Sequence, residues 1–134
     1  MNLVAEIGIN HNGDIEICKK LISIAQIAGF NYVKIQKRNP DLCVPEDQKS
    51  KMRETPWGTM TYLDYKKKIE FNEEQIKNLI EYSKNEGITL FSSVWDTDSI
   101  NLMSKYGDIG KIPSALITNI ELCIEPLRPH RYGT

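Results

Sequence analysis

The chain has 134 residues and a formal net charge of −1, a length that supports one domain but is about half of the roughly 250 residues in an eight-stranded βα barrel. Its charge balance provides no basic field for nucleic acid or an anionic membrane, and no apolar run approaches the roughly 18 residues of a membrane span. The three separated cysteines form no CxxC pair and no secretory signal is present, so we expect a cytoplasmic protein with reduced thiols and a small-molecule partner.

The first expected element is a strand in the segment AEIGINHNG at residues 5–13, which ends in a polar turn. Glu6 lies inside this apolar strand, where an unpaired carboxylate would cost several kcal/mol, roughly. A carboxylate in such a position is a candidate for a catalytic residue. His11 lies in the turn, and two interpretations stay open: it orders the turn through backbone hydrogen bonds, or it approaches a metal.

A helix should follow the cap residue Asp14 and stop at Gly29, because apolar residues recur at three-and-four spacing between them. The expected buried face consists of Ile17, Cys18, Leu21, Ile22, Ala25 and Ala28. The β-branched run at 32–36 then predicts a second strand, which carries Lys34 and Gln36. Strand, helix and strand in so few residues predict a right-handed parallel crossover.

Residues 37–71 are too many for an ordinary βα loop and are typical of a lid or binding element. Their aromatic and apolar residues predict a segment that folds back onto the domain and is not a disordered linker. The lysine run at 66–68 is followed by glutamates. We interpret it as a solvated helix start or loop edge in preference to a phosphate site.

The same alternation of strands and helices recurs in the second half of the chain. We expect a helix over 72–86 ended by Gly87, a strand at 88–94, a helix at 96–106, a strand at 109–112 and a helical start at 118–123. The expected fold is therefore α/β: about four βα units that form an open parallel sheet, with a long loop after the second strand. Its two edge strands are unpaired, so we expect a homo-oligomer or a partner chain that completes the structure.

Five segments carry a resemblance: AEIGINHNG, VKIQ (33–36), TPWGTMTYLDYKKKIEF (55–71), FSSVWD (91–96) and KIPSALITN (111–119). Their order and spacing over residues 3–123 resemble the N-terminal barrel portion of the sialic acid synthase family, which includes synthases of N-acetylneuraminate and legionaminate. The resemblance implies a partial TIM-type barrel. It also implies condensation of phosphoenolpyruvate with an N-acyl aldose, such as N-acetylmannosamine, to a nine-carbon keto acid and phosphate, with manganese or magnesium as the metal of the intact family.

The resemblance further implies roles for six residues. Glu6 is the catalytic candidate and faces the sugar together with Gln36, while Lys34, Ser93, Lys111 and Ser114 bind substrate at the carboxyl ends of the strands. Simpler roles exist for each of them: lysine stems cover apolar surface, and serines cap turns. The segment after Ser93 departs from the family pattern, which leaves the shape of that loop open.

The tail at 124–134 also departs from the family pattern, because Pro126 and Pro129 interrupt the helix that residues 118–123 should begin. The family's metal-binding histidines lie farther along than this sequence extends, and His130 is the only other histidine here. We therefore expect residues 1–123 to be the N-terminal half of a barrel in a truncated chain that binds no metal tightly and has little activity alone. Two alternatives stay open: a Schiff-base aldolase using Lys34 or Lys111, and a non-catalytic phosphate-binding or assembly module that completes another synthase chain.

Overall fold

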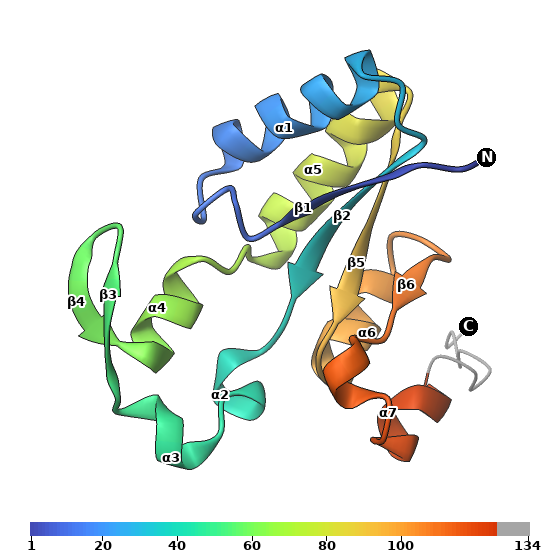
Figure 1. Cartoon of the computed structure of the whole chain (residues 1–134). Coiled ribbons are helices and arrows are strands. Elements are labelled where there is room, and N and C mark those ends of the chain that lie inside the picture. Colours follow the sequence, from blue (N-terminus) through green and yellow to red (C-terminus); the bar gives the residue numbers. More distant parts are fainter. Residues whose placement is uncertain (126–134) are drawn as a thin grey trace.

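The computed structural model describes residues 1–125, and its centre is a parallel four-stranded sheet in the order β1-β2-β5-β6. The strands are β1 (Val4–Gly8), β2 (Tyr32–Lys37), β5 (Thr89–Val94) and β6 (Gly110–Lys111). Figure 1 shows the helices α1 (Ile15–Ile27) and α5 (Glu73–Glu86) packed side by side on one face of this sheet. The expected α/β class, with an open parallel sheet, is confirmed.

The two faces of the sheet have different chemistry, because side chains alternate along a strand. On β2, Val33 and Ile35 are fully buried in the core beneath the helices. Lys34 and Gln36 alternate with them and so point to the opposite face. The residues that the sequence marks as functional therefore belong to the face that the helices leave open.

Helix α1 forms where its cap and its apolar spacing predict. The Asp14 side chain accepts hydrogen bonds from the first turn, and Cys18, Ile22 and Ala25 are buried. The expected buried face is too wide, since Ile17 is 40% exposed and Ala28 is also exposed. The core beneath α1 is therefore narrower than the apolar pattern suggests.

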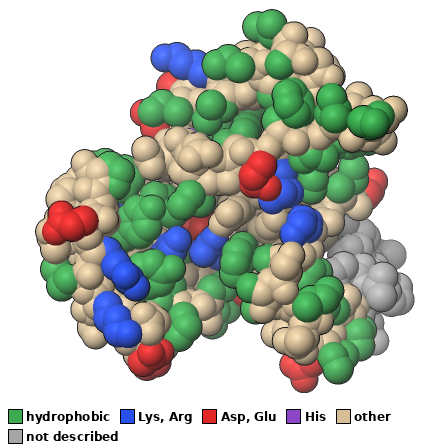
Figure 2. Space-filling model, viewed as in Figure 1, with side chains coloured by type: hydrophobic (Ala, Val, Ile, Leu, Met, Phe, Trp, Pro, Cys, Tyr) green, Lys and Arg blue, Asp and Glu red, His purple; other side chains and the backbone are tan. Residues whose placement is uncertain are grey.

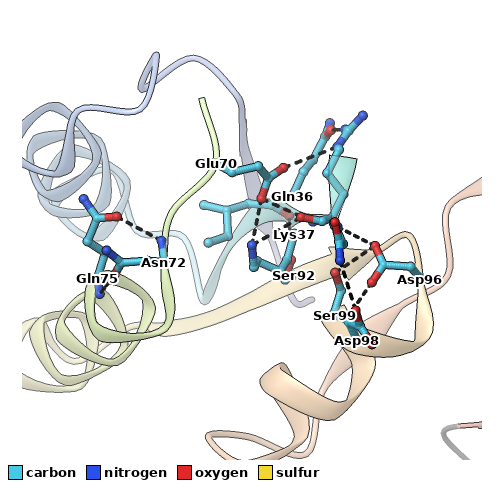
Figure 3. A network of polar contacts seen from close by, with 12 residues as sticks. Gln36, Lys37, Glu70, Asn72, Gln75, Ser92, Asp96, Asp98 and Ser99 are labelled. Atoms are coloured by element: carbon cyan, nitrogen blue, oxygen red, sulfur yellow. Dashed lines mark hydrogen bonds and ion pairs between the residues drawn. The ribbon is translucent and has the colours of Figure 1, made fainter. Parts of the chain in front are cut away.

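Helix α5 is held at both ends by the residues that the sequence indicated. Asn72 and Gln75 form a reciprocal capping box at its start, which Figure 3 shows, and Gly87 ends it in the left-handed conformation with φ 78°. Leu79 on its inner face is fully buried. The next helix, α6 (Thr97–Ser104), starts where the sequence predicts, and Asp96 is its cap residue.

Residues 37–71 form a folded layer of their own at the carboxyl end of β2. This layer contains α2 (Pro40–Cys43), α3 (Glu46–Lys49), an antiparallel hairpin of β3 (Met52–Thr55) and β4 (Gly58–Thr61), and α4 (Tyr62–Lys68). The expectation for the lysine run is wrong for Lys66: this residue lies in the last turn of α4, is 8% exposed and contacts the rings of Tyr62 and Tyr65. Lysines in a last turn complement the helix dipole.

The sheet edges are β1 and β6, as expected from the order of elements. After β6 the described chain contains a 3-10 turn at Ser114–Leu116 and the short helix α7 (Ile120–Ile124). Within residues 1–125, no helix combines the length and apolar character that membrane crossing requires. His130 and the prolines of the expected atypical tail lie outside the described residues.

Candidate functional site

Four of the expected site residues meet on the open face of the sheet. Glu6 lies opposite Lys34 in the β1/β2 register and forms an ion pair with it, and the Lys34 Nζ donates a hydrogen bond of 2.9 Å to the Ser93 Oγ. Gln36 lies opposite Ser93, and Ser93 lies opposite Lys111. Figure 2 shows acidic and basic side chains in contact near the middle of the molecular face in view.

Burial differs across this group in a way that matters for binding. Lys34 is 9% exposed and Ser93 is 3% exposed, whereas the Glu6 side chain is 54% exposed. The lysine is thus held in place by its surroundings, while its carboxylate partner remains accessible. An anionic ligand that reached Lys34 would compete with Glu6 for the ammonium group.

Gly8 lies where Glu6 and Gln36 converge. Its φ of 58° is in the left-handed region, which favours glycine. A Cβ atom on Gly8 would lie 3.3 Å from the Glu6 Oε1 and 3.8 Å from the Gln36 Nε2. The end of β1 therefore lies close to both side chains and helps to bring them together.

The sequence left two roles open for His11, ordering the turn or approaching a metal, and its contacts are those of a residue that orders the turn. It is 1% exposed, its ring stacks on Phe71 at 4.2 Å between centroids, and its Nδ1 accepts a 2.9 Å hydrogen bond from the Gly13 amide. Burial lowers the pKa of His11 to about 4, while a hydrogen bond with the Gly8 backbone acts in the other direction. The ring is neutral at pH 7 and orders the turn.

The described residues do not fit the manganese or magnesium site that the family resemblance implies. Within residues 1–125, no group of three or more histidine, cysteine, aspartate or glutamate side chains is arranged to hold a metal ion. Glu6 supplies one carboxylate, and that carboxylate pairs with Lys34. Hard divalent cations need several oxygen ligands, which this face lacks among the described residues.

Lys111 and Ser114 are placed beside this group but do not join its contacts. Both are exposed, and the Lys111 Nζ lies 3.4 Å from the backbone oxygen of Ile112. Ser114 begins the 3-10 turn without a capping hydrogen bond from a side chain. The sheet register nevertheless brings Lys111 to the strand next to Ser93.

Sequence reasoning missed a buried polar network directly beside the site. The Gln36 Oε1 accepts a hydrogen bond from the Arg38 Nη2, and Arg38 and Lys37 both pair with Glu70, as Figure 3 shows for Glu70 and its partners. Burial raises the pKa of Glu70, although Lys37 and Arg38 lower it. The available signal was the pair of cations directly after VKIQ at the strand end.

Asp96 connects this network to the next strand. It caps α6 through the Ser99 amide at 2.8 Å, and it also accepts hydrogen bonds from the Asn39 amide at 2.6 Å and the Cys43 Sγ at 3.0 Å. The loop after β2 is thereby pinned to the loop after β5. These contacts give the FSSVWD segment a defined shape where the family pattern left it open.

Comparison with known proteins assigns this architecture to a family. The NeuB family model matches residues 21–128. The N,N'-diacetyllegionaminic acid synthase of Campylobacter jejuni is 34% identical over 125 residues, which are 88% of this chain and 36% of that protein. The N-acetylneuraminate-9-phosphate synthase of Mus musculus is 32% identical over 75% of this chain and 28% of that protein.

A solved structure gives the same assignment. The N-acetylneuraminic acid synthetase of Leptospira borgpetersenii, in complex with citrate, superposes with a TM-score of 0.78 at 27% identity, over 92% of this chain and 39% of that one. The chain thus spans about a third of the length of the relatives that it matches. By sequence and by fold, the chain belongs to the NeuB family of sialic acid synthases.

Proposed function

We propose that this chain supplies part of a phosphoenolpyruvate-dependent synthase site, which condenses phosphoenolpyruvate with an N-acyl aldose to a nine-carbon keto acid and phosphate. The observation that carries the proposal is the contact group of Glu6, Lys34 and Ser93 on the open face of the parallel sheet, from the middle of β1 and β2 to the carboxyl end of β5. In βα barrels, substrates bind at the carboxyl ends of the strands. Family membership supports the same reaction class.

Lys34 and Ser93 hold the anionic substrate in this proposal. An ammonium has three N–H donors, and Lys34 directs two contacts to Glu6 and Ser93. An incoming carboxylate or phosphate oxygen accepts a hydrogen bond from the third N–H of the Lys34 ammonium, or it replaces Glu6 as a partner. Lys111, one strand away, adds a second cation, and Ser114 follows it with a hydroxyl donor.

Glu6 and Gln36 face the sugar. Once Lys34 engages the anion, the exposed carboxylate of Glu6 accepts a sugar hydroxyl and assists proton movement. In the reaction itself, carbon three of phosphoenolpyruvate bonds to the aldehyde carbon. Water adds at carbon two, and phosphate leaves as its carbon–oxygen bond breaks. A second copy or another chain would complete the pocket.

Binding of phosphoenolpyruvate to the purified chain tests the role of Lys34. Calorimetry should detect binding that is at least tenfold weaker in Lys34→Met, because the variant loses a charge-assisted contact worth roughly 1.5–3 kcal/mol. Lys20→Met is the matched control, since Lys20 is exposed on α1 and the same charge is removed. Equal weakening in both variants would contradict a specific site.

Turnover tests how much of the site this polypeptide contains. With phosphoenolpyruvate, manganese and N-acetylmannosamine or its diamino analogue, we expect little phosphate release from the 134-residue chain alone. Release at the rate of an intact family synthase would overturn that expectation. Borohydride trapping with pyruvate addresses the aldolase alternative, in which Lys34 or Lys111 is the nucleophile. The proposed condensation forms no Schiff base, so we expect neither lysine to be labelled.

A further inference from the structure

Arg38 is a buried cation that contacts Gln36, one of the two proposed sugar-facing residues. It follows β2 directly, is 8% exposed, and its guanidinium lies 4.4 Å from the centroid of the Trp95 ring. Its Nε lies 3.5 Å from the Glu70 Oε1, and its Nη2 donates to the Gln36 Oε1. One planar group thus contacts an aromatic face, a carboxylate and an amide at once.

We propose that Arg38 is a positioning residue that fixes the side-chain amide of Gln36 so that only N–H donors face the ligand. A guanidinium carries donors and no acceptor. If the Gln36 amide turned around, its NH₂ group would meet the NH₂ group of Arg38, and the Arg38 Nη2 would lose its acceptor in a partly buried place. The planar, donor-only guanidinium of Arg38 therefore selects one amide orientation, and this inference rests on the proposed function of Gln36 in sugar binding.

The fixed orientation defines what the pocket accepts. The Gln36 Nε2 and the Glu6 Oε1 both lie near Gly8, at 3.8 Å and 3.3 Å from the point that a Cβ there would occupy. A donor and a carboxylate acceptor therefore both lie near the end of β1. A sugar hydroxyl suits this pair, because it can donate to Glu6 while it accepts from Gln36. A group that offers only donors would leave the Gln36 NH₂ unpaired.

Arg38 is itself held from two sides, which is what a positioning role requires. Glu70 also accepts hydrogen bonds from the Lys37 Nζ at 2.9 Å and from the Arg38 amide at 3.3 Å. Glu70 lies between α4 and α5. The folded layer of residues 37–71 is therefore connected to Gln36 by successive side-chain contacts, from Glu70 to Arg38 and from Arg38 to Gln36. Lysine at position 38 would keep the charge but lose the planar fork that contacts all three partners.

Nuclear magnetic resonance of the Gln36 side-chain amide tests the proposal in the full chain. In the native protein the ¹⁵N relaxation of the Gln36 Nε2 should be that of a rigid group, whereas Arg38→Lys should make it mobile. Arg53→Lys is the matched control, because Arg53 is an exposed arginine that also lies over a ring, that of Tyr62 at 5.4 Å. Glu70→Gln is a second, nearly isosteric variant, which should loosen the same amide if Arg38→Lys fails to fold. An equally rigid Gln36 amide in the folded variants would overturn the proposal.

Titration with N-acetylmannosamine separates this inference from the proposed function. We expect the sugar to shift the Gln36 amide signals in the native chain and to bind about tenfold more weakly to Arg38→Lys, which corresponds to about 1.4 kcal/mol. Loss of rigidity in Arg38→Lys without any sugar-induced shift in the native chain would support the positioning role and refute the sugar-binding role. Sugar-induced shifts in the native chain, together with an equally rigid Gln36 amide in Arg38→Lys, would support the sugar-binding role and refute the positioning role.

Discussion

The buried ring of His11 should make the stability of this protein depend on pH. His11 stacks on Phe71 and uses its Nδ1 to accept from Gly13, so its folded environment favours the neutral ring. Its pKa falls from 6.5 to about 4 on folding. Protonation therefore favours the unfolded chain. The stabilisation is complete above about pH 6.5 and is lost as the pH falls towards 4.

The size of the effect follows from the two pKa values. With 6.5 for the unfolded chain and about 4 for the folded protein, proton linkage predicts a loss of about 2 kcal/mol between about pH 7.5 and pH 5. At about pH 4 the loss reaches about 3 kcal/mol. Since small domains have stabilities of about 5–15 kcal/mol, this is a large fraction of the total.

Urea unfolding at these pH values measures the effect, with His11→Asn as the reference. Asparagine keeps a side-chain acceptor near the position of Nδ1 but does not titrate in this range. The variant therefore loses the pH-dependent contribution of His11 to the free energy of unfolding and keeps the contributions of all other groups. The native chain should lose about 2 kcal/mol more than His11→Asn between about pH 7.5 and pH 5. Equal losses in the two proteins would refute the assignment of a neutral, buried His11.

Two further predictions concern positions where the chain offers a matched control. Gly13→Ala should cost more stability in urea unfolding than Gly29→Ala: both residues have positive φ, but a Cβ on Gly13 would lie 2.3 Å from the Lys68 backbone oxygen while Gly29 has open space. We expect about 1–2 kcal/mol for Gly29→Ala and about 1–3 kcal/mol more for Gly13→Ala, and similar costs would contradict the close approach. Asp96→Ala should cost about 2–3 kcal/mol, because it removes a buried cap with additional partners, against about 1 kcal/mol for the exposed cap Asp14. The comparison fails if Asp14→Ala is equally costly.

The elements were predictable because their signals are local. Asp14, Asn72 and Asp96 are caps whose side chains satisfy the free amides of a first helical turn, and each begins a helix where expected. Gly87 takes the left-handed conformation that ends α5. The second strand formed at the β-branched run that predicted it.

The layer of residues 37–71 was less predictable because its contacts join distant positions. Glu70 meets Lys37 and Arg38 across more than thirty positions of sequence, and no local periodicity encodes that pairing. Lys66 is buried against two tyrosine rings although a run of three lysines usually indicates a solvated surface. The candidate site could thus be located from its strand ends, but its supporting contacts could not.

The first turn of the chain divides structural and chemical roles between neighbouring residues. His11 is buried, neutral and occupied by backbone contacts, so it stabilises the turn. Glu6 lies at the same strand end with an accessible carboxylate, and its partner Lys34 is fixed by burial and by Ser93. The ion pair with Glu6 and the hydrogen bond to Ser93 orient the lysine side chain. In the function that we propose, an anion that displaces Glu6 would gain a cation that needs no further ordering, and the released carboxylate would become available to the sugar.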